Sequence, residues 1–292
     1  SLDKPLLNRA LRGTYSPGST YKPFMALAAL TLGKRTPQQA ISDPGYYNFG
    51  NHTFRDDKEG GHGSVDMYKS IVASCDTYYY MLANDLGVDA IHDFMAPLGL
   101  GQLTGIDMQG ELRGVLPSTE WKRNAYKKKE MQKWYAGETI SLGIGQGQNT
   151  FTMLQMAQAT ATVASGGQRF KPHLVKVVEN FETREQRRSI GEALPPMAWK
   201  PEHVEFIRRA MYGVTQEGTG RAAFLNAPYK AGGKTGTAQV IGIKQGEKYN
   251  AHLLDERHRD NALFTAFAPV DSPQIAIALV VENAGFGAGA AA

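Results

Sequence analysis

The sequence predicts an α+β fold, in which helices of the first half pack against an antiparallel sheet formed mainly by the second half. Helical periodicity dominates residues 20–165, whereas short strand patterns separated by turn residues dominate the C-terminal part. Strands and helices do not alternate along the chain, which argues against a parallel sheet. With 42% hydrophobic and 21% charged residues among 292, the chain has the composition of a folded globular protein.

The first helix is expected over residues 20–32, where apolar side chains recur after the turn signal Ser16-Pro17-Gly18. Residues 33–64 are rich in Gly, Pro, Asp and Asn, and they predict a long irregular segment of the kind that often carries function. Further helices are expected at 65–86, at 88–95, from 117 onwards behind an N-cap, and at 152–165.

Two polar segments lie between these helices. The run from Lys122 to Lys133 holds six basic residues and is predicted to be a solvated face. The glycine-rich stretch from Gly143 to Gly147 matches neither the dinucleotide nor the Walker pattern, which argues against nucleotide binding.

The C-terminal part predicts the sheet. A strand is expected at 174–179 and a helix at 202–214. Three strand signals follow at 234–240, 262–268 and 274–281, and the last two are joined as a hairpin by the turn residues 269–273. These strands predict antiparallel pairing.

Charge and cysteine content exclude several classes of protein. The formal net charge of +4 is too small to indicate a nucleic-acid partner, and the single cysteine, Cys75, cannot form an internal disulfide. No run of eighteen apolar residues and no signal peptide is present. The chain opens without Met and ends in a Gly-Ala run that looks like the first turn of a helix, so we expect an excised domain.

The first chemical motif is Ser19-Thr-Tyr-Lys22, which places a hydroxyl and an amine on one face of a helix start. A serine becomes a nucleophile when a nearby base removes its proton, and a lysine can serve if it is neutral. The spacing S-x-x-K occurs by chance in a chain of this length, so this motif alone is a weak indication.

Two more motifs with chemically active side chains follow along the chain. Ser74-Cys75-Asp76 lies inside a helical pattern, and Lys234-Thr235-Gly236-Thr237 lies on a predicted strand. A glycine inside a strand allows another backbone or a ligand to approach closely, so Gly236 is expected to mark a strand edge that can hold a substrate.

The ordered set S-x-x-K, S-x-D and K-T-G resembles that of penicillin-binding proteins and serine β-lactamases. Flanking segments resemble the class B penicillin-binding proteins, and among them the elongation-type penicillin-binding protein 2 subgroup; these segments are 15–23, 116–123 and 144–147. The resemblance runs from about residue 5 to 289. It implies a β-lactamase/D,D-peptidase-like fold: an antiparallel, about five-stranded sheet covered by helices plus a helical subdomain.

The resemblance also implies the domain organisation. Residues 1–292 would form one transpeptidase domain, with a helical part at about 17–165 and a sheet part mainly at 168–292. A membrane anchor and an N-terminal pedestal domain would be absent from this sequence.

By the same resemblance, Ser19 would be the acylated nucleophile and Lys22 its general base, while Ser74 and Lys234 would relay protons to the leaving group. The hydroxyls of Thr235 and Thr237 would bind the terminal carboxylate of the substrate along the strand at Gly236. The backbone N–H groups of Ser19 and Thr237 would form the oxyanion hole. Asp76 would contact the substrate where many relatives have Asn, and a carboxylate can only accept hydrogen bonds, so it must be protonated or paired with a lysine.

The function that this resemblance implies is peptidoglycan D,D-transpeptidation, with stem peptides ending in D-Ala-D-Ala as donors and β-lactams as covalent inhibitors. The resemblance implies no catalytic cofactor and no nucleic-acid partner. It places the protein on the periplasmic side of the inner membrane, where its partners would be elongation-machinery proteins that include a glycosyltransferase. The alternatives are a D,D-carboxypeptidase, a non-enzymatic β-lactam-sensing receptor domain and a β-lactamase. The last lacks support because no Glu-x-x-Leu-Asn occurs. The segment 241–260 is expected either to border the acceptor side or to be a surface hairpin.

A zinc site is predicted beside the second motif. Cys75 could join Asp43, Asp56 and His62 of the segment 33–64 in a tetrahedral site, with Asp57 as the substitute if Asp43 does not serve. Such an ion would pin this segment to the active-site helix. The spacing fits no standard zinc motif, and the alternative is a buried thiol beside solvated carboxylates.

Overall fold

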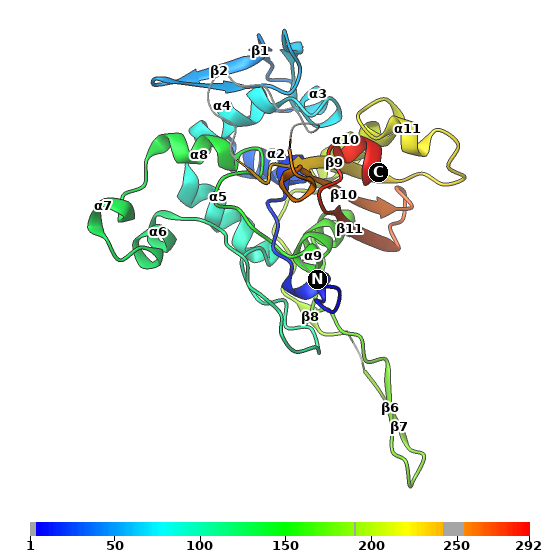
Figure 1. The fold of residues 1–292 in the computed structure, drawn as a ribbon. Coiled ribbons are helices and arrows are strands. Elements are labelled where there is room, and N and C mark those ends of the chain that lie inside the picture. The colour runs from blue at the N-terminus through cyan, green and yellow to red at the C-terminus, as the bar shows by residue number, and fades with distance from the viewer. Residues whose placement is uncertain (1–3, 190, 242–253) are drawn as a thin grey trace.

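The computed structural model describes residues 4–189, 191–241 and 254–292, and its central element is an antiparallel sheet (Figure 1). The sheet contains β9 (Gly232–Ala238), β10 (Asn261–Ala268) and β11 (Ile275–Val281) in the order β11-β10-β9. The hairpin between β10 and β11 is therefore confirmed, with Ala268 opposite Ile275. Within the described residues this sheet has three strands, so the expectation of about five is wrong for this part of the chain.

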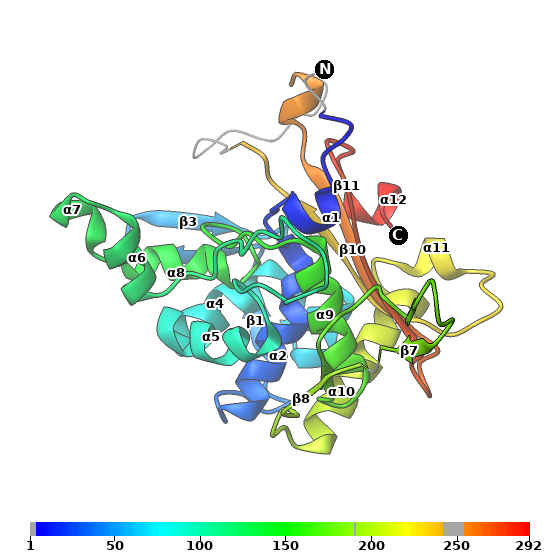
Figure 2. The same ribbon diagram turned by 90° about the horizontal axis from the view of Figure 1, so that it is seen from below.

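Helices cover both faces of the sheet (Figure 2). On one face α2 (Lys22–Thr31), α9 (Met153–Ala164) and α10 (Pro201–Gln216) bury the main core, in which α9 packs on β11 and α10 on β9. On the other face α11 (Arg221–Phe224) and α12 (Gly287–Ala290) lie over a small apolar cluster that contains Phe264. The mixed helix and sheet architecture agrees with the prediction.

The helix expected over 65–86 is interrupted. The structure has α3 (Met67–Val72) and α4 (Asp76–Leu86), separated at Ser74 by a backbone φ of 62°. A left-handed residue with a side chain ends a helix, because continuing it would bring Cβ against the next carbonyl. The second motif therefore lies at a junction between two helices and not inside one.

The segment 33–64, expected to be irregular, contains two short ladders above α4 (Figure 1). β1 (Ile41–Asp43) pairs with β4 (Gly63–Val65), and β2 (Tyr46–Phe49) pairs with β3 (His52–Arg55). The Gly, Pro and Asn residues that suggested a loop form the turns of these ladders.

The remaining elements connect and surround these layers. They are α1 (Arg9–Arg12), η1 (Gly18–Tyr21), α5 (Val88–Met95), η2 (Ala96–Leu98), α6 (Thr119–Ala125), α7 (Lys129–Gln132), α8 (Ala136–Leu142), β5 (Arg169–Phe170), β6 (Val177–Glu179), β7 (Gln186–Arg188), β8 (Ala193–Leu194) and η4 (Glu256–His258). The strand expected at 174–179 is β6, which pairs with β7 in a projecting hairpin outside the central sheet (Figure 1).

Two further expectations are resolved at the periphery. The basic run is exposed as predicted except at Lys122, which is buried and paired with Glu138 on α8. None of the helices in the described ranges has the length and apolar character needed to cross a bilayer. Most of the segment 241–260 lies outside the described residues.

Candidate active site

Ser19 lies on η1, directly before α2, where the chain passes against β9. This approach depends on Gly18, whose φ is +53° and where a Cβ would lie 2.5 Å from the carbonyl oxygen of Thr237. The Gly18 N–H donates to the carbonyl of Gly145 at 3.1 Å, which holds the turn from its other side. Gly18 therefore allows the serine to lie against the K-T-G strand.

Gly236 serves the same contact from the strand side. A Cβ at Gly236 would lie 2.8 Å from Thr20 Cγ2 and 3.1 Å from the Thr20 backbone nitrogen. The close approach that its sequence predicts is thus made by the η1 backbone. Gly236 also lines the cavity over Ser19, so the substrate contact expected for it from the sequence stays a prediction.

Lys22 is fully buried at the first position of α2 and points at the second motif. Its Nζ lies 2.6 Å from the Ser74 carbonyl oxygen, 3.2 Å from Ser74 Oγ and 2.5 Å from Asp76 Oδ1. The left-handed backbone of Ser74 turns both of its oxygens toward this amine. Because an ammonium has three donors, these three acceptors saturate Lys22.

Lys234 approaches Ser74 from the opposite side. Its Nζ lies 2.9 Å from Ser74 Oγ and 3.0 Å from the Thr235 carbonyl oxygen, and the side chain is fully buried. Burial, and then the charge of Lys22, hold the pKa of Lys234 well below its usual range. One hydroxyl therefore bridges two buried amines, of which Lys234 loses its proton more readily than an ordinary lysine.

Asp76 is the counter-ion of Lys22. Its side chain is 14% exposed, against 0% for Lys22. Burial raises the pKa of the Asp76 carboxyl, and the nearby Lys22 opposes that rise. The pairing with a lysine, one of the two possibilities that the sequence left open for Asp76, is the arrangement in this structure.

Hydroxyl and amide groups outside the three motifs contact the K-T-G strand. Thr219, in the loop after α10, places Oγ1 2.6 Å from Thr235 Oγ1. The Gly287 N–H donates to Thr237 Oγ1 at 3.1 Å, and Gln146 Nε2 donates to the Thr237 carbonyl at 3.1 Å. A hydroxyl that accepts one bond keeps its proton to donate, which suits Thr237 to bind an anion.

A cavity of about 910 Å³ opens over Ser19, and it has two ends. One end is bounded by β9 and the C-terminal segment and is lined by Thr237, Gln239, Asp260, Phe286 and Ala288. The other end is bounded by β2, β3 and the turn after them. It is lined by Tyr46, His52, Thr53, Phe54, Arg55, Asp57 and Glu59. Ser74 and Asp76 also line the cavity.

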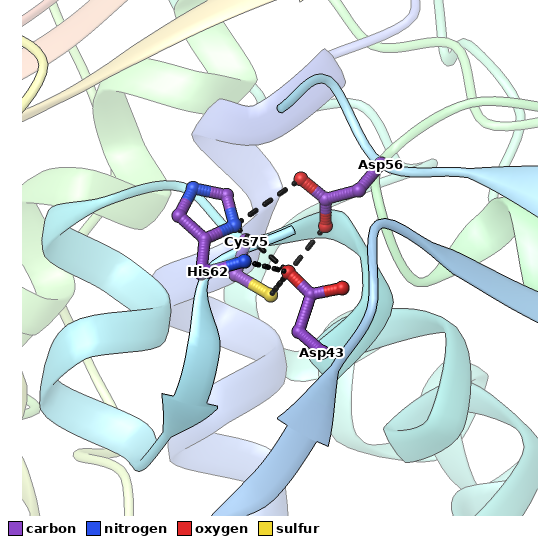
Figure 3. A group of neighbouring side chains, drawn as sticks. All are labelled: Asp43, Asp56, His62 and Cys75. Atoms are coloured by element: carbon purple, nitrogen blue, oxygen red, sulfur yellow. Dashed lines mark hydrogen bonds and ion pairs between the residues drawn. The ribbon is translucent and has the colours of Figure 1, made fainter. Parts of the chain in front are cut away.

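A second cluster lies behind Asp76, on the side of α4 that faces the two ladders (Figure 3). It contains the four side chains of the predicted zinc site: Asp43 at the end of β1, Asp56 after β3, His62 before β4, and Cys75 before α4. One potential ligand atom from each lies within 4.8 Å of the others. Asp57 is not in this group and lines the cavity.

The contacts within this cluster converge on the carboxylates. His62 Nδ1 lies 2.9 Å from Asp43 Oδ2 and 3.3 Å from Asp56 Oδ1. Cys75 Sγ lies 3.4 Å from Asp43 Oδ2 and 3.5 Å from Asp56 Oδ2. Burial and the charge of Asp56 raise the pKa of the Cys75 thiol far above its usual range, so this thiol remains protonated unless a cation joins it.

Hydrogen bonds fix the carboxylates in this position. Burial alone would raise the pKa of Asp43, but hydrogen bonds from donors such as Gly45 and His62 lower it to about 2. The second oxygen of Asp56 accepts the Thr77 N–H at 2.8 Å, at the first turn of α4. One thiol, one imidazole and two ionised carboxylates form a donor set that fits Zn²⁺.

Comparisons with known proteins show what the chain as a whole resembles. A family model described as the penicillin binding protein transpeptidase domain matches residues 1–292. The peptidoglycan D,D-transpeptidase MrdA of Acinetobacter baumannii is 44% identical over 294 residues, covering 100% of this chain and 43% of that protein. The chain thus spans less than half the length of this curated relative.

Solved structures with the same fold include PBP2 of Pseudomonas aeruginosa in complex with WCK 5153. It has a TM-score of 0.84 and 40% identity, covering 99% of this chain and 61% of that one. The complex between PBP2 and MreC from Helicobacter pylori matches with a TM-score of 0.83 and 29% identity, covering 99% of this chain and 49% of that one.

Proposed function

The chain belongs to the penicillin-binding protein transpeptidase family, and we propose that it is an elongation-type peptidoglycan D,D-transpeptidase that works through a Ser19 acyl-enzyme. The observation that carries the proposal is the bridging of Ser74 Oγ by two buried lysine amines, at 3.2 and 2.9 Å. A proton can pass along such a chain between the nucleophile and the leaving group.

In the acylation step, Ser19 Oγ attacks the carbonyl of the penultimate D-alanine and transfers its proton to Lys22. An ammonium that already donates three protons cannot accept another, so Lys22 must first pass one proton to Asp76 Oδ1, 2.5 Å from its Nζ, and then act as a neutral amine. The leaving amine then receives its proton through Ser74, with Lys234 as the second amine on the same hydroxyl. The ester bond to Ser19 forms as the peptide bond breaks.

Substrate binding would use the K-T-G strand. The hydroxyls of Thr235 and Thr237 would bind the terminal carboxylate, oriented by Thr219 and by the Gly287 N–H. The backbone N–H groups of Ser19 and Thr237 would stabilise the oxyanion, because η1 lies against β9 at this point.

The test separates transpeptidation from carboxypeptidation. The full chain is incubated with a D-Ala-D-Ala pentapeptide, with and without an amine-bearing stem peptide, and the products are resolved by mass. An amide product that requires Ser19 supports the proposal. Hydrolysis as the only reaction would instead indicate the carboxypeptidase alternative, and penicillin labelling without turnover of either kind would indicate a sensing domain.

The cellular setting proposed for this activity is the periplasmic side of the inner membrane, where its inhibitors would be β-lactams. A relative has been solved with MreC, which supports an association with elongation-machinery proteins. The family resemblance adds a glycosyltransferase as a second partner. No cofactor is required for the chemistry, because nucleophile, base and anion-binding groups all come from the chain.

We further propose that Asp43, Asp56, His62 and Cys75 hold a structural Zn²⁺. The ion would tie both ladders to the start of α4 and so fix Asp76 and Ser74. Metal content by mass spectrometry should show one zinc per chain, absent in Cys75→Ser, with a lower melting temperature in that variant. If Cys75→Ser keeps both its zinc and its melting temperature, the proposed zinc site is ruled out.

A further inference from the structure

The cavity end formed by β2 and β3 has no role in the chemistry described so far. Its wall is seated on α4, since the Phe54 ring lies 5.4 Å from that of Tyr80 and Tyr80 Oη donates to the Arg55 carbonyl at 3.0 Å. Tyr80 is one helical turn beyond Asp76. This wall therefore borders the side of the site at which Ser74 and Asp76 lie.

The second half of the reaction requires a place for an amine. In acylation the leaving amine departs beside Ser74, where it receives a proton. In deacylation the acceptor amine must lose a proton, and microscopic reversibility places it at the same position beside the same hydroxyl. The remainder of the acceptor can then extend from Ser74 along α4, whose Tyr80 contacts Arg55, to the part of the same cavity that β2 and β3 line.

We propose that the β2–β3 wall, meaning the cavity-lining residues Tyr46 and Arg55, binds the acceptor, an amine-bearing peptide; this inference rests on the proposed transpeptidase function. Tyr46 is 46% exposed and lies directly opposite Arg55 in the ladder, so the two side chains leave one face of the hairpin together, while Phe54 on the other face packs on Tyr80 and supports them. Tyr46 offers an aromatic surface to the peptide body, and Arg55 offers a cation to a peptide carboxylate.

A carboxylate beside the wall suits the amine end of the acceptor. Glu59 lines the same part of the cavity, and a peptide amine arrives largely as an ammonium. After one proton is lost to solvent, the neutral nitrogen attacks the ester carbon. The C–N bond then forms, the bond from that carbon to Ser19 Oγ breaks, and the second amine proton returns to Ser19 Oγ by way of Ser74.

The donor occupies the other end in this assignment. Thr237, Gln239 and Phe286 line the end along β9, where the K-T-G strand provides the oxyanion donor and carboxylate-binding hydroxyls. The leaving D-alanine vacates its position beside Ser74 before the acceptor arrives, so the acceptor amine can take that position while the peptide body extends toward the wall. The wall should therefore affect the fate of the acyl-enzyme more than its formation.

The test measures how the acyl-enzyme partitions between water and amine. A D-alanyl thioester acylates the full chain, and a synthetic stem peptide with one free amine is titrated as acceptor, with amide and acid products counted by mass. Tyr46→Ala and Arg55→Gln should each raise the acceptor concentration for half-maximal amide formation about tenfold, the loss expected from one good contact. Tyr229→Ala, a tyrosine of similar exposure outside the cavity, is the matched control and should change nothing.

The outcomes separate the two proposals. Unchanged partitioning in both variants would overturn the acceptor assignment, and slower acylation with unchanged partitioning would show that the wall binds the donor. Because Arg55 is exposed, Arg55→Gln keeps the test valid if Tyr46→Ala fails to fold. Failure of the unaltered chain to form any acyl-enzyme would refute the proposed function itself.

Discussion

Gly18 provides the most direct link between a backbone conformation and catalysis, and Gly18→Ala is the perturbation that tests it. The added Cβ would lie 2.5 Å from the Thr237 carbonyl oxygen. Relief of that overlap requires Ser19 and β9 to separate by roughly 0.5 Å or more, and displacements of up to about 1 Å in an active site can cost about 100-fold in rate. We therefore expect penicillin acylation to slow by about 100-fold.

Gly33→Ala is the matched control. Gly33 also has a left-handed backbone, with a φ of +66°, but nothing lies within 4 Å of the added Cβ. Both variants incur the backbone strain of about 1–2 kcal/mol, so both should melt a few degrees below the unaltered chain.

The assay for this pair is stopped-flow acylation with a chromogenic or fluorescent penicillin, accompanied by calorimetry. Only Gly18→Ala should lose acylation rate. Equal acylation rates in Gly18→Ala and Gly33→Ala would refute the claim that this glycine sets the distance between Ser19 and the K-T-G strand.

Two further substitutions test the groups around Ser74 and Thr235. Lys234→Met should abolish penicillin acylation without lowering the melting temperature at pH 7, because it removes a buried amine. Burial lowers the pKa of Lys234, so the unfolded chain binds the additional proton and the unaltered protein gains stability as pH rises toward about 10.4. Between pH 7 and pH 10 the melting temperature of the parent should therefore rise relative to that of Lys234→Met. A difference between the two melting temperatures that stays constant in calorimetry over this range would contradict this. Thr219→Val, which removes the 2.6 Å hydrogen bond to Thr235, should slow acylation by a β-lactam carboxylate about 5- to 10-fold. Thr219→Ser should restore the rate, and loss in both variants would mean that Thr219 acts through packing.

The sequence predicted the chemistry of the site better than its shape. Ser19, Lys22, Ser74 and Lys234 could be found because their ordered motifs resemble those of a known family. The structure places Lys22 and Lys234 on Ser74 Oγ, and Ser19 and Ser74 line one cavity. The same pattern could not show that Ser74 interrupts a helix. With its left-handed backbone, Ser74 places two oxygens on Lys22, 52 residues away, and no local propensity encodes such a contact.

The four side chains of the metal cluster were predicted from residue types alone, and the fold brings them within 4.8 Å of one another. The short ladders that carry them were missed, since their glycines and prolines resemble those of a loop. Gln146 and Thr219 were also missed, although Gln146 lies in the glycine-rich stretch that the sequence singled out. Their roles depend on long-range contacts with Thr235 and Thr237.

Gly236 shows how one signal can have two structural meanings. Its sequence position predicts a close approach to the strand, and a close approach exists, but the approaching group is Thr20 of the chain itself. A glycine in a strand indicates that another group lies close to the strand backbone at that position. Only the tertiary structure identifies that group.

The central claim is that Ser19 forms a covalent acyl-enzyme, and intact-mass spectrometry after adding a penicillin to the full chain and to Ser19→Ala tests it most directly. The account predicts a stable adduct on Ser19 that persists for minutes to hours and is absent from Ser19→Ala. A short-lived adduct with rapid loss of penicillin would indicate a β-lactamase, and an adduct that survives in Ser19→Ala would contradict the assignment of the nucleophile.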